Sequence, residues 1–483
     1  MQFLGQREMH KINHANIKDW AKNYKGELFD GILCDPPYHL TSMSKPRTDL
    51  EDYDNGKGNP YARRQAAMKG FMGKEWDGVD ENGIGIAQDP EMWRLLYNLL
   101  KPGAHLLAFS GSRTYHRMAV AIEDAGFEIR DMIEWVYGSG FPKSLNIGKE
   151  VDKIQGNERE ASSSTTDCNY FPEPCKGHGD NNGRYGETIH AQATKGTSEW
   201  EGYGTALKPA HEPCVLARKP IDGTVANNVL KHGTGGLNID GTRIKTSDSL
   251  DGGGTIDKSN YETVTLPSVP VRGVTGNDTG GRFPANLIHD GSDEVEAVFP
   301  QTGKSSGGRI GNKGSMINTM GNAFEKGDPG FGDSGSASRY FYCAKASKSE
   351  RNAGLEGFEL KEPPASARSK PAEGRQNALG EPRQNHHPTV KPLSLTKYLA
   401  TLIKPPTGGR LLVPFSGSGS EMIGALQAGW EYVEGVELTE EYIPIAEARI
   451  KYWQNISQTS SKPKVSAKNA EPVQHQAESL TLF

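Results

Sequence analysis

Short apolar runs that stop at proline or glycine alternate with helical segments at both ends of the chain. Near the N-terminus, residues 28–34 form such a run before two prolines, and residues 105–110 form another after a Pro-Gly turn. Near the C-terminus, residues 410–413 open onto a glycine-rich corner, and a helical segment and the run 431–436 follow. Such alternation of strand and helix is typical of a parallel sheet covered by helices. The sequence therefore predicts an α/β fold.

The middle of the chain lacks this alternation. Residues 141–207 are mostly polar, and residues 221–385 mix brief apolar runs with many of the 58 glycines in the 483-residue sequence. Between them, the apolar run 214–218 predicts one more strand. We therefore expect a first half of the core domain (1–140), a polar insertion (141–207), a returning strand (208–220), a loop-rich insertion (221–385), a second half of the core domain (386–455) and a flexible tail (456–483).

Composition excludes several classes of protein. No stretch reaches about 18 consecutive apolar residues, the length of a membrane span, and the first residues lack the apolar stretch of a secretory signal. Five scattered cysteines are too few for a disulfide framework, so a reducing, cytoplasmic setting is expected. The formal net charge is -5, but residues 301–400 hold 15 Lys and Arg against 9 Asp and Glu. This local excess of positive charge fits a surface that faces phosphate groups.

The glycine-rich corner after residues 410–413 has the features of a nucleotide-binding turn. It contains Gly417 and Gly419, which let a ligand approach the backbone closely, and a helix begins directly behind them. The next strand ends in Glu437, and a carboxylate at that position can bind both hydroxyls of a ribose. The spacing differs from the six-residue dinucleotide fingerprint, which argues against a nicotinamide enzyme. We therefore predict a nucleoside pocket at this corner.

The second corner is the sequence Asp35-Pro36-Pro37-Tyr38, which ends the first apolar run. Because the prolines fix φ and carry no N–H, the carbonyl of Pro36 can point into a cleft with no competing donor beside it. The Asp35 carboxylate and this carbonyl can accept both hydrogens of an exocyclic amine on a base, and Tyr38 can stack on that base. A strand cap followed by a packed tyrosine is the structural alternative. The nucleoside pocket predicted at the other corner favours the catalytic interpretation.

Three motifs, in this order, resemble those of the amino-methyltransferases of DNA. They are Asp35-Pro36-Pro37-Tyr38, the segment 387–392 (HPTVKP) and residues 414–419 (PFSGSG). The order, with the catalytic motif first and the cofactor motif last, resembles the permuted β group of that family. The resemblance implies S-adenosylmethionine as the cofactor and a Rossmann-like, circularly permuted sheet from residues 1–140, 208–220 and 386–455, near half of the chain, with a large loop-rich target-recognition region at 221–385. Residues 138–143, 211–220 and 281–286 also resemble segments of phage and prophage methylases.

The resemblance implies roles for individual residues. The Asp-Pro-Pro corner would hold the target amine while Tyr38 stacks on the flipped base. Glu437 would bind the ribose of the cofactor, and Lys391 would position its methionine end, unless Lys391 is simply a solvated lysine. The residues that would wrap the cofactor are Pro414, Phe415, Ser416, Gly417, Ser418 and Gly419.

Two positions depart from the pattern of the family. Val413 stands where an aspartate usually precedes the Pro-Phe pair, so one cofactor contact is missing or replaced. Glu421, in the first turn of the following helix, is the expected replacement, although an acidic residue there is also ordinary capping electrostatics. Asn16 stands near the position from which an acidic residue often binds the adenine of the cofactor, and asparagine can still hydrogen-bond there.

The reaction implied by the resemblance is direct transfer of a methyl group to the exocyclic N6 of adenine in double-stranded DNA, after the base has been flipped out of the duplex. Aspartate at position 35 favours adenine in family terms, and N4 of cytosine is the alternative target. Two further alternatives are a DNA-binding relative with weakened catalysis, suggested by Val413, and a methyltransferase that acts on RNA or a protein amide. The sequence does not distinguish a monomer from a homodimer or identify a restriction partner.

Recognition of the target site would fall to cations of the loop-rich insertion, unless these are only solvated. The candidate DNA contacts are Arg243, Arg282, Arg309, Arg339, Lys345, Lys348 and Arg351. Cys168, Cys175 and His178, with Cys214 as a fourth ligand, have an irregular spacing that argues against zinc. We therefore predict no metal.

Overall fold

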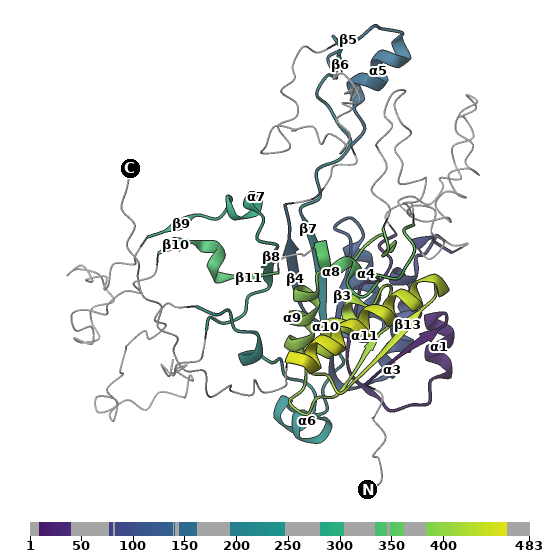
Figure 1. Ribbon diagram of the computed structural model, residues 1–483, viewed down its shortest axis with the longest axis vertical. Coiled ribbons are helices and arrows are strands. Elements are labelled where there is room, and N and C mark those ends of the chain that lie inside the picture. The colour runs from purple at the N-terminus through teal and green to yellow at the C-terminus, as the bar shows by residue number, and fades with distance from the viewer. Residues whose placement is uncertain are drawn as a thin grey trace, which may run out of the picture.

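The computed structural model describes residues 9–39, 77–80, 83–138, 140, 144–161, 194–246, 281–303, 334–344, 348–361 and 383–460. Its centre is a nine-stranded sheet (Figure 1), in the order β1 (His10–His14), β13 (Tyr432–Glu437), β12 (Arg410–Val413), β2 (Phe29–Cys34), β3 (Leu100–Phe109), β7 (His211–Arg218), β4 (Glu128–Val136), β8 (Leu287–His289) and β11 (Tyr342–Cys343). Neighbouring strands are parallel, except that β7 runs antiparallel to both β3 and β4. The predicted α/β fold is confirmed, with a mixed but mostly parallel sheet.

Helices cover both faces of the sheet because its central strands are apolar on both sides. In β3, Leu106 and Ala108 pack into the core on one face, whereas Leu107 and Phe109 pack into the core on the other. The helices of the first face are α1 (Ile17–Asn23), α3 (Pro90–Asn98) and α4 (Tyr115–Asp124). Those of the second face are α9 (Leu393–Ile403), α10 (Ser420–Gln427) and α11 (Ile443–Ser460).

The strands that come first and last in the described sequence are neighbours in the sheet. β1 pairs with β13 in parallel, from His10 beside Val433 to His14 beside Glu437. β12, which lies next, pairs with β2 through Leu411 and Leu412. Because these strands run in one direction, the residues that follow β2, β12 and β13 emerge at the same edge of the sheet.

Most of the predicted elements appear within a few residues of their expected bounds, but one predicted turn is wrong. Pro102 and Gly103 do not separate helix from strand, because β3 begins at Leu100 and runs through them. The main-chain N–H of Gly103 donates to the carbonyls of Lys219 and Pro220, and its φ of +78° is one that glycine adopts readily. Hydrogen bonds to the end of β7 therefore keep this pair within the sheet.

The loop-rich insertion is not separate from the sheet, since β8 and β11 extend it from within residues 221–385. Farther along the chain, α11 continues to Ser460, beyond the expected start of the tail at 456. Three elements lie beyond one end of the sheet in Figure 1, namely α5 (Ile147–Gln155), β5 (Glu160–Ala161) and β6 (Thr194–Lys195). The remaining helices and strands are α6 (Val225–His232), α7 (Asp293–Glu296), β9 (Gln301–Thr302), β10 (Gly335–Ser336) and α8 (Lys348–Asn352). The 3₁₀ helices are η3 (Ile86–Gln88), η5 (Asp240–Thr242), η8 (Ala337–Tyr340) and η10 (Glu440–Tyr442). Among all these described residues, no helix combines the length and apolar character of a membrane span.

A glycine sets the distance between α9 and α10 beside the glycine-rich corner. A Cβ on Gly424 would lie 2.3 Å from Oγ1 of Thr396 and 2.7 Å from the main-chain nitrogen of Lys397. The indole of Trp430 fixes the same contact by donating to the carbonyl of Ala400 at 3.0 Å. The two helices therefore pack with their backbones close together.

We expect Gly424→Ala to lower the free energy of unfolding by about 1–3 kcal/mol, because the new methyl group has to push α9 away. At an open helical position the same change would instead raise stability, by about 0.5–1 kcal/mol. The measurement is urea unfolding followed by circular dichroism. Gly357→Ala is the control, since a Cβ there would have no neighbour within 4 Å. Equal stability of both variants would contradict the close packing of α9 and α10.

Candidate active site

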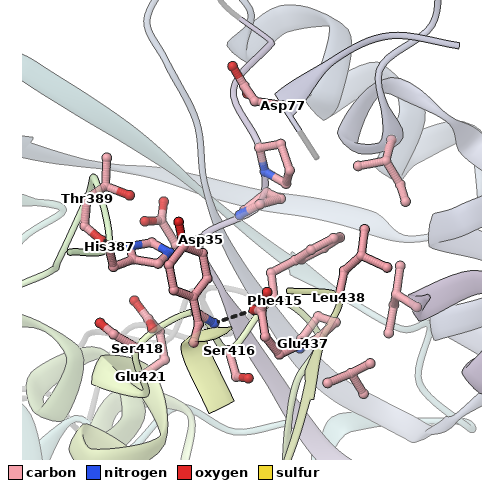
Figure 2. Close-up of a pocket in the computed structure, with 18 of the residues that line it drawn as sticks. Asp35, Asp77, His387, Thr389, Phe415, Ser416, Ser418, Glu421, Glu437 and Leu438 are labelled. Atoms are coloured by element: carbon pink, nitrogen blue, oxygen red, sulfur yellow. Dashed lines mark hydrogen bonds between the residues drawn. The ribbon is translucent and has the colours of Figure 1, made fainter. Parts of the chain in front are cut away.

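A cavity of about 150 Å³ lies where β2, β12 and β13 end. The four residues of the Asp35 corner line it. It is also lined by these predicted cofactor-binding residues: Asn16, Lys391, Pro414, Phe415, Ser416, Gly417, Ser418, Glu421 and Glu437. Gly419 does not line it, because it faces α11, where an added Cβ would lie 3.2 Å from Cβ of Ala446. The structure thus brings the catalytic corner and the cofactor corner of the prediction to one cavity (Figure 2).

The Asp35 corner is held by a network of charged and phenolic groups. Nζ of Lys391 donates to Oδ2 of Asp35 at 2.6 Å and to the hydroxyl of Tyr38 at 3.0 Å, and it lies 3.1 Å from Oε2 of Glu212. The hydroxyl of Tyr38 in turn lies 2.8 Å from Oδ1 of Asp35 and 2.9 Å from Oε2 of Glu212. Its single proton serves one of these carboxylates at a time. Two carboxylates therefore share one ammonium group and one phenol.

The neighbouring carboxylates keep Lys391 charged and Tyr38 protonated in this network. Burial alone would lower the pKa of Lys391, but the carboxylates of Asp35 and Glu212 outweigh it and raise the pKa above its ordinary value. Burial and the same two carboxylates raise the pKa of Tyr38, so this phenol stays protonated. Burial, followed by Glu212, also raises the pKa of Tyr137 to about 12. Lys391 is thus a fixed positive charge between two acids.

Glu212 and the position of Lys391 were not anticipated from sequence. Lys391 was expected to position the methionine end of a cofactor, and the structure places its ammonium group on Asp35 instead, although the residue does line the cavity. Glu212 reaches the network from β7, the antiparallel strand of the sheet. The only signal for it was the likeness of segment 211–220 to phage methylases, which assigned no role to the carboxylate.

The glycine-rich corner is shaped by hydrogen bonds to Glu437. The main-chain N–H of Gly417 donates to Oε2 of Glu437 at 2.7 Å, and that of Thr439 donates to Oε1 at 2.8 Å. Burial raises the pKa of Glu437 even so. Gly417 has a φ of +48°, and a Cβ there would lie 2.8 Å from Nε2 of His387. A glycine is therefore required where the loop passes His387.

A buried arginine supports this corner from the side of α11. Arg449 has no exposed surface, and its guanidinium donates to the carbonyl and hydroxyl oxygens of Ser418 and to the hydroxyl of Ser420. Burial lowers the pKa of Arg449 to about 10, which still leaves the group charged at neutral pH. No local pattern distinguishes Arg449 from the other cation of this long helix.

Other residues of the cavity were missed or have a second role. His387 begins the 387–392 segment and was given no role of its own. It lines the cavity, and burial lowers its pKa to about 3, so that the ring is neutral. Asp77 also lines the cavity and accepts from the main-chain N–H of His39 at 2.8 Å. The side chain of Asn16 caps α1, because its oxygen accepts from the N–H of Lys18 at 2.9 Å. A cofactor contact would therefore use the side-chain NH2 group of Asn16, because the oxygen is already engaged.

None of the predicted DNA contacts that the structure describes lines the cavity. Arg243 and Arg339 line a second cavity, of about 670 Å³, together with Lys245 and Lys397. Arg282 and Arg339 both lie over the ring of Tyr340, at 4.5 and 4.4 Å. Arg309 and Lys345 lie outside the described residues, and Lys348 begins α8.

Arg351 has a structural partner rather than an open position. Its guanidinium donates to the main-chain carbonyls of Asn385 and His387, and burial lowers its pKa to about 10. It therefore holds the segment that carries His387 into the cavity.

The cysteines give no metal site in the described residues. Cys168, Cys175 and His178 lie outside them, and Cys214 is buried in β7. Within the described ranges no three acidic, histidine or cysteine side chains converge as metal ligands. Cys34, beside the Asp35 corner, is also buried, which raises the pKa of its thiol well above the ordinary value.

Comparison with known proteins gives two similar sequences. No family model matches the chain. The chain is similar to the type II methyltransferase M.HindIII of Haemophilus influenzae, with 25% identity over 233 residues that make up 45% of this chain and 61% of that protein. It is also similar to YubD of Escherichia coli (strain K12), named as a predicted methylase, with 40% identity over 65 residues, 14% of this chain and 28% of that protein. The chain thus spans less than two thirds of either relative. The resemblance to methyltransferases is confirmed.

Solved structures also align with the chain. They include the cytosine-N4-specific PvuII DNA methyltransferase, at 10% identity over 93% of this chain and 92% of that chain, with a TM-score of 0.37. M1.HpyAVI in its SAM complex aligns at 13% identity over 92% of this chain and 99% of that chain, with a TM-score of 0.33. TM-scores this low do not relate individual elements of two structures.

Replacing Lys391 by methionine should lower the free energy of unfolding by up to about 3 kcal/mol at pH 7.5, because the partly buried carboxylates of Asp35 and Glu212 then lose their counter-charge. Adding Glu212→Gln should recover part of this loss, since one of the two carboxylates is removed. The measurement is urea unfolding of both single variants and the double variant as a thermodynamic cycle.

The control for this cycle is Lys231→Met, which breaks the exposed ion pair with Asp222 and should leave stability nearly unchanged. Strict additivity of the Lys391 and Glu212 substitutions would show that the two side chains do not share one network.

Proposed function

We propose that this protein is an S-adenosylmethionine-dependent DNA methyltransferase that methylates the exocyclic N6 of adenine in duplex DNA. The observation that carries the proposal is the convergence of two corners on one cavity. Asp35 and Pro36 follow β2, and the glycine-rich corner with Glu437 follows β12 and β13, the strands beside it. An amine-binding pair and a nucleoside pocket are what a transfer between these two groups requires. The similarity to M.HindIII supports the same reaction class.

The residues of the cavity fit the cofactor. Gly417 and Glu437 offer a close approach to the backbone and a carboxylate whose two oxygens are oriented by main-chain N–H groups, as a ribose site needs. Phe415 lines the cavity on the same side as Glu437 and Leu438, and Ser418 and Glu421 lie across from them in Figure 2. When bound, S-adenosylmethionine supplies a methyl group activated by its sulfonium.

The side chains of the Asp35 corner would hold and polarise the target amine. Asp35 accepts one amine hydrogen and the carbonyl of Pro36 accepts the other, while Tyr38 offers a face for the flipped base. The ion pair with Lys391 leaves room for this, because each carboxylate oxygen has two lone pairs. As the nitrogen gains the methyl group, Asp35 accepts a hydrogen bond from it, and the proton that the nitrogen loses passes to water. The contribution of the chain is thus alignment and charge, with no covalent intermediate.

Three finer points belong to the same proposal. Adenine is the proposed target because aspartate occupies position 35, as in adenine enzymes of the family. The permuted order is supported by the pairing of β1 with β13, which joins an early and a late segment of chain in one sheet. The described cations of residues 221–385, with Arg243 and Arg339 at the second cavity, are the proposed source of DNA contacts.

Purified protein should transfer label from methyl-labelled S-adenosylmethionine to unmodified duplex DNA, and digestion to nucleosides should yield N6-methyladenine. Asp35→Ala should lower kcat by about 100-fold or more, because one of the two acceptors for the amine is lost. Asp19→Ala, an exposed change on α1, is the matched control and should retain full activity.

Each other result has a defined meaning. N4-methylcytosine as the product would overturn adenine as the target and keep the reaction class. Label in RNA or protein but not in DNA would overturn the substrate. Activity of Asp35→Ala equal to that of the unaltered protein would overturn the role of this corner.

A further inference from the structure

Glu421 is a buried acid that points into the candidate active site. It lies in the first turn of α10, is only 4% exposed and lines the cavity close to Ser418 (Figure 2). Its carboxylate accepts a hydrogen bond from its own main-chain N–H. Among the described residues, no ion pair or side-chain hydrogen bond satisfies it further. A buried carboxylate is normally paired, so this one calls for an explanation.

The other acids of the cavity are already engaged. Asp35 is paired with Lys391, Glu437 accepts from two main-chain N–H groups, and Asp77 accepts from that of His39. Of the described residues that line the cavity, four are carboxylates and Lys391 is the one with a permanent positive charge. The cavity therefore has a negative surplus, and Glu421 is the member of it that lacks a partner.

The surroundings of Glu421 oppose its ionisation. Burial, followed by repulsion from Asp35, raises its pKa to about 7, against an ordinary value of 4.5. The charged and titratable groups that face it are Cys34 of β2, Asp35 directly after β2, Lys391 before α9 and Arg449 of α11. Lys391 and Arg449 favour the charged form but do not prevail. The cavity thus carries an acid whose charged form a positive ligand would stabilise.

Neutralising Arg449 is the structural alternative for Glu421. The guanidinium of Arg449, however, donates to Ser418, Ser420 and the carbonyl of Glu350, and no ion pair with Glu421 forms within the described ranges. If Glu421 served only to balance Arg449, its removal would destabilise the folded protein. If it serves a ligand, its removal would relieve the cost of a buried carboxylate that Asp35 repels in the free protein.

We propose that Glu421 is the counter-charge for the cationic methionine end of the cofactor, and that it makes binding of a cationic nucleoside depend on its carboxylate. This rests on the proposed function, since it names the part of the same cavity that takes the positive end of S-adenosylmethionine. Val413, fully buried and absent from the cavity, supplies no charge there. Glu421 therefore provides from the helix what the strand end lacks.

The test compares Glu421→Gln with the unaltered protein by isothermal titration calorimetry at pH 8. We expect the Kd of S-adenosylmethionine to rise at least tenfold, while the Kd of methylthioadenosine, which lacks the methionine end and its charges, stays the same. S-adenosylhomocysteine distinguishes the two cations of the ligand. An equal loss for it assigns Glu421 to the ammonium group, and a smaller loss assigns it to the sulfonium. Unchanged affinity for S-adenosylmethionine overturns the proposal.

Acidity gives a second readout. In the unaltered protein the affinity for S-adenosylmethionine should fall as the pH drops below about 7, because Glu421 then binds a proton in the free state. In Glu421→Gln the affinity should not follow pH in this window. A pH dependence that survives the substitution overturns the assignment to Glu421.

Thermal unfolding without ligand separates the proposal from the structural alternative. Folding raises the pKa of Glu421, so its ionisation costs the fold stability as pH rises from 4.5 to about 7, and the cost is complete above that. At pH 8, Glu421→Gln should therefore unfold at the same or a higher temperature than the unaltered protein. A lower temperature, with equal loss of all three ligands, would show a structural role and overturn the proposal.

Glu434→Gln is the matched control. Glu434 is buried to the same degree in β13 but pairs with Asn13 and Arg410 outside the cavity. Its substitution should leave the affinity for S-adenosylmethionine unchanged. If the unaltered protein itself binds no S-adenosylmethionine, the proposed function fails, and this outcome is distinct from normal binding by Glu421→Gln.

Discussion

The ion pair between the buried Lys391 and the partly buried Asp35 is the contact on which the candidate site depends. It joins residues 356 positions apart in sequence and lies where β2 and the segment before α9 meet. Asp35, Glu212 and Tyr38 would otherwise place two carboxylates and a phenol together with no positive charge among them. With Lys391 present, the same groups hold one another in fixed positions. The Asp35 corner is therefore held in place by a closed network of charged and phenolic groups.

The glycine-rich corner is fixed by a different kind of contact. Main-chain N–H groups orient Glu437 from one side, and the buried Arg449 holds the serine residues from the other. Glu421 lies close to both corners, and burial and Asp35 oppose its charged form more than Lys391 and Arg449 favour it. A protein that keeps such a group bears a cost in stability, which is common where binding requires an unpaired charge. The two corners thus differ, since one is electrostatically complete and the other is not.

Sequence patterns predicted the parts of the fold that depend on local order. The strand, corner and helix units at 28–38 and 410–428 are visible because apolar runs, prolines and glycines lie next to one another in the chain. Glu212, Arg449 and Asp77 were missed because their importance arises from long-range contacts. The residues next to them in the sequence form no pattern that indicates these contacts. The turn predicted at Pro102 and Gly103 was wrong for the same reason. The N–H of Gly103 donates to carbonyls directly after β7, and these hydrogen bonds override a local turn preference.

The pairing of β1 with β13 and of β2 with β12 bears on how the chain acquires this structure. The strand β2 forms early during synthesis, but its partner Leu411 is 380 residues away from Gly31. Until that late segment leaves the ribosome, one edge of the early sheet has no strand beside it. Contacts of such long range also slow folding, because a long loop must close first. The early half of the chain therefore keeps an open strand edge until the late half pairs with it and completes the candidate active site.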